Sequence, residues 1–304
     1  MAVATPAEEF AGGTLVREQT SLWMDGWRRL RRNRLALAAT IYLGLLLLVA
    51  LIGVRWTPHD PNAISLTDNY ASPSAAFPFG GDHLGRDLLS RVIVGAQISL
   101  LVGICTQVVV LAVGVTLGLI AGYFRGWIDG LLSLVINVFY GVPDLLVAMI
   151  LVIIPLPGFA AGPSIQKIII AIAATRWMDM ARLVRGQALS LREREFIEAA
   201  KSSGARPHKI LFGHLLPNSL GPIIVQATLG IPSAILFEAF LSYLGLGVRP
   251  PTPSWGSMAS EGVQALRLAP HVVMPPAIAL VLTLLAFNFL GDGLRDAFDP
   301  RQKR

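Results

Sequence analysis

Two acidic residues lie inside long apolar stretches of this 304-residue chain, where a charged side chain is costly unless it is paired or has a functional role. Asp144 follows Pro143 within the stretch 130–154, and Glu238 lies within the stretch 219–242. An aspartate at the centre of a membrane helix costs about 2.5–3.5 kcal/mol on insertion scales, so it faces a bundle interior or a wet path. Asp144 and Glu238 are therefore candidate residues of a polar pathway. A satisfied hydrogen bond between helices is the competing explanation for Asp144.

The polar segment 186–218 indicates a second possible function, docking to another protein. Ser190 followed by Glu193 fits a capping box that starts a helix. Gly204 suits a left-handed stop after that helix, and Pro207 suits the first turn of a second short helix. Such a unit is too polar for lipid and too short to fold alone. Its paired alanines favour docking into a partner's groove, with a plain amphipathic connector as the alternative.

The chain shows no residue pattern of an enzyme. A nucleotide-binding P-loop needs Gly-Lys followed by Ser or Thr, and the dipeptide Gly-Lys is absent. The five histidines are dispersed, with no i,i+4 pair suited to a metal, and no Ser/His/Asp grouping can be assembled. The sequence predicts no catalytic residue, no metal ligand and no cofactor bound by the chain itself. Energy for any active process has to come from a partner or from an ion gradient.

The composition predicts an all-α polytopic membrane protein. Hydrophobic residues make up 54% of the chain and charged residues 14%, against roughly 25% charged residues in a soluble domain. Disorder is excluded because it needs low hydrophobicity and high charge. Six charge-poor stretches are long enough to cross a hydrocarbon core of roughly 30 Å as helices. They are residues 35–54, 92–124, 130–154, 164–184, 219–242 and 271–291.

Six crossings place both termini on one side of the membrane, and the basic residues indicate which side. Nineteen of the 25 Lys and Arg residues fall on the side of the termini and of segment 186–218. Because basic residues gather in cytoplasmic loops, that side is expected to be the cytoplasm, and the net charge of +6 needs no nucleic acid to explain it. The expected parts are a cytoplasmic amphipathic segment 1–34, a first span 35–54, an external loop 55–91, a five-helix unit 92–293 and a cytoplasmic tail 294–304.

Two smaller patterns concern packing between the expected spans. Gly114, Gly118 and Gly122 repeat at four-residue intervals, which is typical of a close helix-packing face. The partner helix could belong to this chain or to a second subunit. Arg176 and Asp179 stand three residues apart in the fourth span, and we expect them to neutralise each other.

Several of these motifs resemble those of a known family. Glu198-Ala199-Ala200, Gly204 and Leu216-Pro217 resemble the EAA signature of ATP-binding-cassette (ABC) importer permeases. Further matches follow in that family's order and cover most of the chain. They are Phe79–Arg91, Leu241–Gly247 with the proline-rich run after it, and Gly291–Asp296. Together they resemble the C-type permease subunit of dipeptide, oligopeptide and nickel importers.

The chain departs from the family pattern at three positions. His214 stands two residues before Leu216-Pro217, where most ABC permeases have an apolar residue, and this departure is familiar in the peptide-transporting branch. Gly81 replaces a frequent threonine and Gln97 a frequent arginine. Both residues lie near the expected external face, so these two departures bear on how docking or gating takes place at that face.

The resemblance implies a type I ABC importer permease fold with a cytoplasmic coupling helix, in the cytoplasmic membrane of a prokaryote. It implies four protein partners besides the lipid bilayer: a B-type permease subunit, two ATPase subunits that bind ATP and Mg²⁺, and an extracytoplasmic substrate-binding protein. The residues it assigns to ATPase coupling are Glu198, Ala199, Ala200, Gly204, His214, Leu216 and Pro217. Peptides are the expected cargo. Nickel or another small solute is the alternative, and a secondary transporter is a weaker one.

Overall fold

The computed structural model describes residues 22–155, 157–159 and 162–298. Over these residues the chain is helical, and the only strand-like pairing is an isolated bridge between Gly81 and Asp87. The expected segments 1–34 and 294–304 are described only from residue 22 and up to residue 298. The main helices are α1 Leu22–Arg32, α2 Arg34–Ile52, α3 Leu88–Phe124, α4 Gly126–Tyr140, α5 Asp144–Ile153, α6 Ile165–Arg192, α7 Glu195–Ser202, α8 Pro207–Ile210, α9 Leu216–Tyr243, α10 Trp255–Gln264 and α11 Met274–Phe298.

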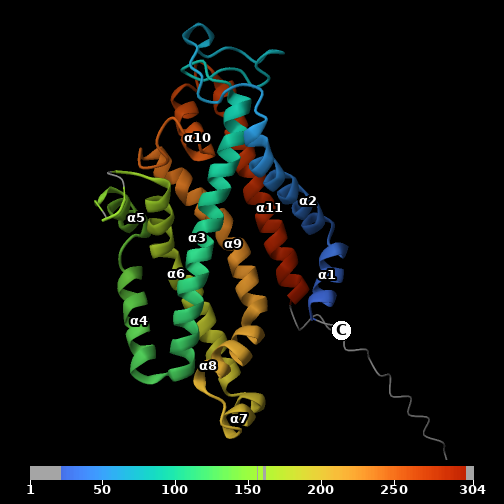
Figure 1. Cartoon of the computed structure of the whole chain (residues 1–304), viewed down its shortest axis with the longest axis vertical. Coiled ribbons are helices and arrows are strands. Elements are labelled where there is room, and N and C mark those ends of the chain that lie inside the picture. The colour runs from blue at the N-terminus through green and yellow to red at the C-terminus, as the bar shows by residue number, and fades with distance from the viewer. Residues whose placement is uncertain (1–21, 156, 160–161, 299–304) are drawn as a thin grey trace, which may run out of the picture.

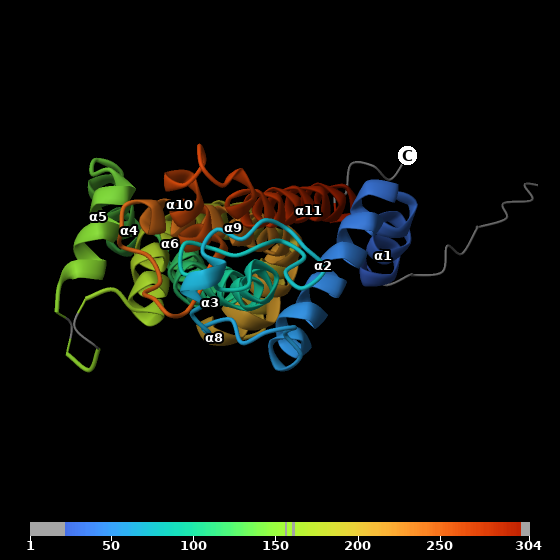
Figure 2. The same cartoon turned by 90° about the horizontal axis from the view of Figure 1, so that it is seen from above.

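Three long helices, α3, α6 and α9, form the centre of an elongated bundle (Figures 1 and 2). Helix α3 packs against α6 through the glycine face identified in the sequence. A Cβ atom added at Gly114 would lie 2.7 Å from Met180 Cβ, and one at Gly118 would lie 2.6 Å from the Ala181 carbonyl oxygen. The small residues therefore bring two helices of the same chain together. The partner helix of this glycine face is thus α6 of this chain and not a helix of a second subunit.

The apolar stretch 130–154 is two helices rather than one. Helix α4 ends at Tyr140, α5 begins at Asp144, and their axes differ by 88°. Pro143 lies in the break, where it lacks the N–H that a continuous helix would need. Asp144 consequently sits at the start of a helix instead of within one.

Four helical segments are long and apolar enough to cross a membrane, and the bent α4–α5 pair would be a fifth. The four are Arg34–Ile52, Leu88–Phe124, Pro207–Tyr243 and Pro270–Phe298. The stretch expected as the fourth span is a helix, α6, which has 28 residues but is not among these candidate spans. Its central part carries the charged residues Arg176, Asp179, Arg182 and Arg185. Helix α6 is therefore long enough to cross but too charged to be recognised by its hydropathy.

Helices α1, α2 and α11 form a layer at one side of the bundle, and α4 and α5 lie at the opposite side (Figure 2). Asn33 ends α1 and caps α2, because its side chain accepts hydrogen bonds from the backbone N–H groups of Leu35 and Ala36, both at 3.2 Å. Helix α2 then packs on α11, where a Cβ atom at Gly293 would lie 2.3 Å from Ala36 Cβ.

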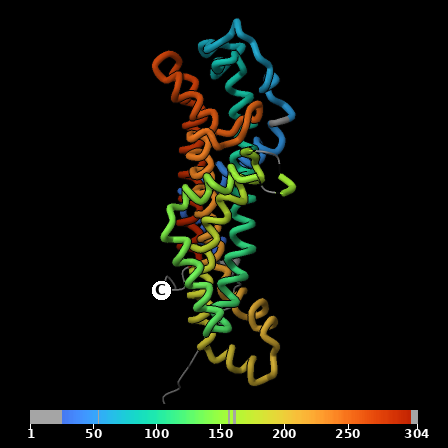
Figure 3. The backbone as a smooth tube through the Cα atoms, turned by 90° about the vertical axis from the view of Figure 1, so that its left-hand side faces the viewer, coloured from blue at the N-terminus to red at the C-terminus, as the bar shows by residue number. Residues whose placement is uncertain are grey.

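The two ends of the bundle carry different structures (Figures 1 and 3). At one end, segment 55–91 folds over the start of α3 beside α10. At the other end, α7 and α8 form a hook that projects beyond the long helices. This hook lies within segment 186–218, from which the sequence predicts docking.

Candidate functional site

The hook begins later than the sequence predicts. Ser190 and Glu193 do not form a capping box, because Ser190 lies inside α6 and Glu193 follows its last residue. Helix α7 starts at Glu195, and the residue before it, Arg194, makes no side-chain capping hydrogen bond. The packing of α6 on α3 keeps α6 helical past Ser190, since a Cβ atom at Gly122 would lie 2.6 Å from Ala188 Cβ.

Gly204 ends α7 as predicted. Its φ of +78° lies in the left-handed region, which glycine adopts without steric cost. The N–H of Gly204 donates to the Lys201 carbonyl at 2.9 Å, and the N–H of Ala205 donates to the Ala200 carbonyl at 3.0 Å. This pair of bonds is a Schellman motif, which satisfies the carbonyl groups at a helix end and reverses the chain.

The second helix of the hook starts at Pro207 as predicted, but it continues into α9. Residues Leu211–Leu215 form a π-turn between α8 and α9, and the N–H of Leu216 donates to the Leu211 carbonyl. Pro217 then lies in the first turn of α9, directly after the π-turn. The hook is therefore joined directly to a membrane helix without a flexible linker.

One face of the hook is buried in the bundle. Ile197 of α7, Ile210 of α8 and Leu215 of the π-turn are each 0% exposed. They belong to a single apolar cluster with Met180 and Val184 of α6. The hook is thus packed directly against α6. These anchoring residues were absent from the predicted site, although their apolar type within a polar segment was a visible signal.

The opposite face of the hook is open. Among the predicted coupling residues, the exposed ones are Glu198, Ala199, Gly204 and Pro217, and the half-buried ones are Ala200, His214 and Leu216. Gly204, Ala200 and His214 line a common hollow between α7 and α8. Two aromatic residues that the sequence did not single out, Phe196 and Phe212, are 41% and 55% exposed. This face of the hook therefore exposes small, acidic, basic and aromatic side chains.

The hook is also tied to the turn between α3 and α4. The Arg192 guanidinium donates to the Tyr123 carbonyl at 2.6 Å, and Lys201 lies 6.0 Å from the Tyr123 ring centroid. Arg125 and Glu193 form an ion pair at 3.1 Å. These exposed contacts are individually weak, and together they fix the direction in which α7 leaves α6.

Arg176 and Asp179 do not pair with each other as expected, and each has another partner. Arg176 Nη2 lies 3.2 Å from Asp144 Oδ2, so Arg176 pairs across to α5 and not along its own helix with Asp179. Asp179 accepts a hydrogen bond from the Tyr140 hydroxyl instead. The α4–α5 break places Tyr140 and Asp144 on opposite sides of the bend, where both reach α6.

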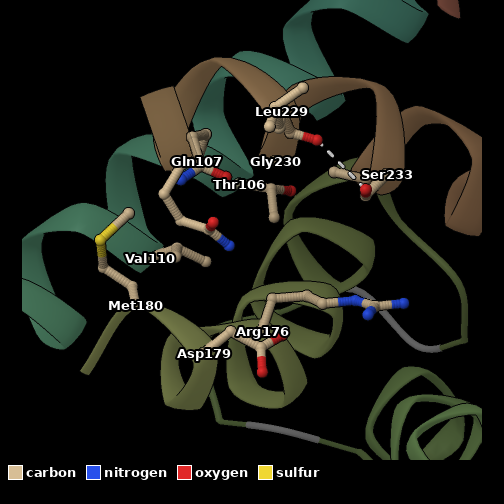
Figure 4. Close-up of a pocket in the computed structure, with 11 residues that line it drawn as sticks. Thr106, Gln107, Val110, Arg176, Asp179, Met180, Leu229, Gly230 and Ser233 are labelled. Atoms are coloured by element: carbon tan, nitrogen blue, oxygen red, sulfur yellow. Dashed lines mark hydrogen bonds between the residues drawn. The ribbon is translucent and has the colours of Figure 1, made fainter. Parts of the chain in front are cut away.

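A cavity lies beside these residues at the meeting of α3, α6 and α9 (Figure 4). It has a volume of about 140 Å³. Its polar lining residues are Thr106, Gln107, Arg176, Asp179, Gln226 and Ser233. Asp144 reaches the cavity through its ion pair with Arg176. A polar cavity among otherwise apolar membrane helices is a candidate part of a pathway.

Glu238, the second acidic candidate, is buried between α9 and α10. Its side chain is 0% exposed and accepts hydrogen bonds from the hydroxyl groups of Ser242 at 2.7 Å and Ser254 at 2.8 Å. Ser254 in turn caps α10. The contacts of Glu238 join the start of α10 to α9, which is a packing arrangement.

The motif Phe79–Arg91 forms a charged network at the opposite end of the bundle. Arg86 Nε lies 2.7 Å from Asp82 Oδ2, and Arg86 Nη2 lies 3.4 Å from Glu261 Oε2 of α10. Arg91 approaches both carboxylates, at 3.4 and 4.0 Å. The ligand atoms of Asp82, His83 and Glu261 lie within 4.8 Å of one another, as a metal would need. The two guanidinium groups already balance the two carboxylates, so the arrangement is an ion-pair network that joins the loop to α10.

Comparison with known families gives two matches that together cover most of the chain. Residues 114–304 match a family described as "Binding-protein-dependent transport system inner membrane component". Residues 21–73 match a family described as "N-terminal TM domain of oligopeptide transport permease C".

Individual relatives are similar over nearly their whole length. The dipeptide transport system permease protein DppC of Bacillus subtilis (strain 168) is 43% identical over 290 residues, which cover 95% of this chain and 88% of the relative. The oligopeptide transport system permease protein OppC of the same organism is 39% identical over 301 residues, covering 98% and 97%. The glutathione transport system permease protein GsiD of Pectobacterium atrosepticum is 40% identical over 282 residues, covering 92% of each chain.

Proposed function

Because the chain belongs to the family of binding-protein-dependent transport system inner membrane components, we propose that it is the membrane-spanning permease subunit of an ATP-driven peptide importer. The names of three similar proteins support a peptide as the cargo, since they refer to dipeptides, oligopeptides and glutathione, all of which are peptides. The chain itself supplies the path and not the energy, because it lacks the Gly-Lys dipeptide of a P-loop.

The proposed topology has six crossings, made by α2, α3, the α4–α5 pair, α6, α9 and α11. An even number of crossings puts both termini on one side, together with the hook. The basic residues Lys201, Arg206 and Lys209 lie in the hook, which supports a cytoplasmic position for it. Segment 55–91 and α10 then face outward, where a substrate-binding protein would deliver cargo.

The hook is proposed to be the coupling element, and one observation carries this assignment. Its buried face, with Ile197 and Ile210, is part of the core of the membrane bundle, while Glu198 and Ala199 on its other face are exposed. A unit with one face fixed in the bundle and one face free can transmit a partner's movement to the helices. The proposed partner at this surface is one ATPase subunit. The complex would contain two such subunits, which would bind ATP and Mg²⁺, and a second permease subunit would complete the pore.

The remaining predicted site residues have distinct proposed roles. Gly204 fixes the reversal between α7 and α8, and Ala199 leaves room for a partner's surface. His214 and Ala200 line the hollow between α7 and α8, and Pro217 lies in the first turn of α9. Asp144 belongs to the pathway by holding Arg176. The burial of Glu238 supports a packing role between α9 and α10.

A reconstituted complex tests the proposal. The chain, its partner permease, the ATPase subunits and the binding protein are placed in liposomes, and uptake of a labelled peptide is measured with ATP and without it. We expect uptake only with ATP, and we expect Ala199→Trp to abolish uptake while the protein still inserts. Ala38→Trp is the matched control, because Ala38 is also an exposed alanine but lies on α2. ATP-independent uptake, or equal effects of the two substitutions, would contradict the assignment.

A further inference from the structure

The polar cavity of Figure 4 has hydrogen-bonding groups that nothing in the described structure uses. Thr106 is 1% exposed and Gln107 is 6% exposed, and both line the cavity from α3. The Thr106 hydroxyl oxygen and the Arg176 Nε atom are buried without a hydrogen-bond partner. A buried polar group without a partner costs free energy, so its persistence calls for an explanation.

Thr106 differs from other threonines of the bundle in this respect. The hydroxyl groups of Thr116, Thr175 and Thr228 each donate to a carbonyl of their own helix, at 2.7, 2.9 and 2.9 Å. This local bond is the usual way for a helical threonine to satisfy its hydroxyl group. The Thr106 hydroxyl lacks such a bond and remains available to a ligand in the cavity.

The shape of α9 keeps the Gln107 amide in place. Gly230 faces it, and a Cβ atom at that position would lie 2.1 Å from Gln107 Oε1. Any residue larger than glycine would therefore displace the amide from the cavity wall. The same cavity contains Asp179 and Ser233, which are exposed, so the cavity is open on that side.

The unused groups are mainly donors. The Thr106 hydroxyl, the Gln107 amide nitrogen and the Arg176 Nε–H can each donate, while the charge of Arg176 is already paired with Asp144 through Nη2. The acidic residue of the cavity, Asp179, already accepts from Tyr140. Unpaired donors that include a guanidinium N–H suit a ligand group rich in acceptor oxygens, and every unmodified peptide carries such a group, a carboxylate, at its C-terminus.

We infer that this cavity is a half-site for the C-terminal carboxylate of a short peptide in transit. The inference rests on the proposed function and adds a recognition site inside the permease to it. The volume of about 140 Å³ is below the 300–1,000 Å³ typical of complete small-molecule pockets, so the cavity holds one end of a peptide. The rest of the peptide extends through the open side. Binding there is weak and transient, as passage requires.

A cysteine-protection experiment tests the site in the assembled complex. Cys105, the sole cysteine of the chain, is replaced by alanine, and Ser233→Cys places a thiol at the cavity. The rate of maleimide labelling of this subunit is measured with and without the dipeptide Ala-Ala, and with its C-terminal amide, in nucleotide-free and ATP-bound complexes. We expect Ala-Ala to slow labelling several-fold in at least one of these states and the amide to slow it much less. Equal protection by both compounds, or protection by neither in both states, would overturn the inference.

Two matched variants identify the groups responsible. Thr106→Val removes only the hydroxyl group, and because that group has no partner, the protein should fold as before. Thr116→Val makes the same change on the same helix, outside the cavity. Protection by Ala-Ala should fall with Thr106→Val and persist with Thr116→Val. Retained protection in Thr106→Val contradicts the assigned donor. The labelling needs neither uptake nor ATP hydrolysis, so its failure is distinguishable from a failure of the proposed function.

Discussion

Replacement of Gly204 by alanine isolates the contribution of one backbone angle to coupling. A Cβ atom at Gly204 meets nothing within 4 Å, so the substitution introduces no clash. Its effect comes from the φ of +78°, which costs an L-residue other than glycine about 1–2 kcal/mol. The anchoring residues Ile197 and Ile210, both fully buried, contribute about 1.5–3 kcal/mol each, so the hook should stay folded against the bundle.

The strain in Gly204→Ala should therefore appear when the ATPase subunits dock. A hook that relaxes when free has to be bent again on docking, and 1–2 kcal/mol corresponds to roughly 5- to 30-fold weaker binding. Titration of the ATPase subunits onto the permease pair in nanodiscs measures this shift. Gly186→Ala is the control, because its Cβ atom also meets nothing within 4 Å but Gly186 lies inside α6.

Asparagine at position 204 separates backbone strain from side-chain bulk. Asparagine tolerates the left-handed region better than alanine, although its side chain is larger. The order of docking affinity should be glycine, then asparagine, then alanine. An asparagine variant that binds more weakly than the alanine variant would refute the backbone explanation and indicate that the partner packs directly onto Gly204.

Three further substitutions test the anchoring, the helix packing and the external network. Ile197→Ala leaves a cavity under the hook and should destabilise the protein by about 2–5 kcal/mol, seen as a lower midpoint of thermal aggregation in detergent, whereas Phe196→Ala on the exposed face should change the midpoint little. Gly118→Val should prevent close packing of α3 on α6 and reduce the yield of folded protein. Gly44→Val on α2 is the control, because a Cβ atom at Gly44 meets nothing within 4 Å. Equal yields of the two variants would contradict a role of Gly118 in helix packing. Arg86→Met leaves the buried network short of one positive charge and should lower the same midpoint by more than a surface substitution does, and an unchanged midpoint would contradict a stabilising role.

The sequence predicted well those structural features that depend only on residues close together in the chain. The positions of α2, α3, α9 and α11 followed from uninterrupted apolar stretches, because the cost of burying charge in lipid acts on every residue of a span. The reversal at Gly204 and the helix start at Pro207 also followed, since a backbone angle and a missing N–H are properties of single residues.

Features that depend on residues far apart in the chain were not predictable in the same way. The capping box at Ser190 failed because packing of α6 on Gly122 of α3 extends α6 past it. The pairing of Arg176 with Asp144 depends on the bend between α4 and α5, which brings together residues 32 positions apart. The spacing along the sequence suggested Asp179, three residues away, as the partner of Arg176. That spacing contains no information about the bend.

Helix α6 connects the two functional regions, and its composition explains how one helix can serve both. Its lower part contributes Val184 to the apolar cluster that holds the hook, and its middle part contributes Arg176 and Asp179 to the polar cavity. Met180 belongs to both, since it packs in the cluster and lines the cavity. The glycine face of α3 holds α6 at short range along this length, so we expect a tilt imposed at the hook to displace the cavity wall with little loss in between. The charges that make α6 a poor membrane helix by hydropathy therefore lie in the proposed path, on the same helix as the residues that hold the proposed coupling element.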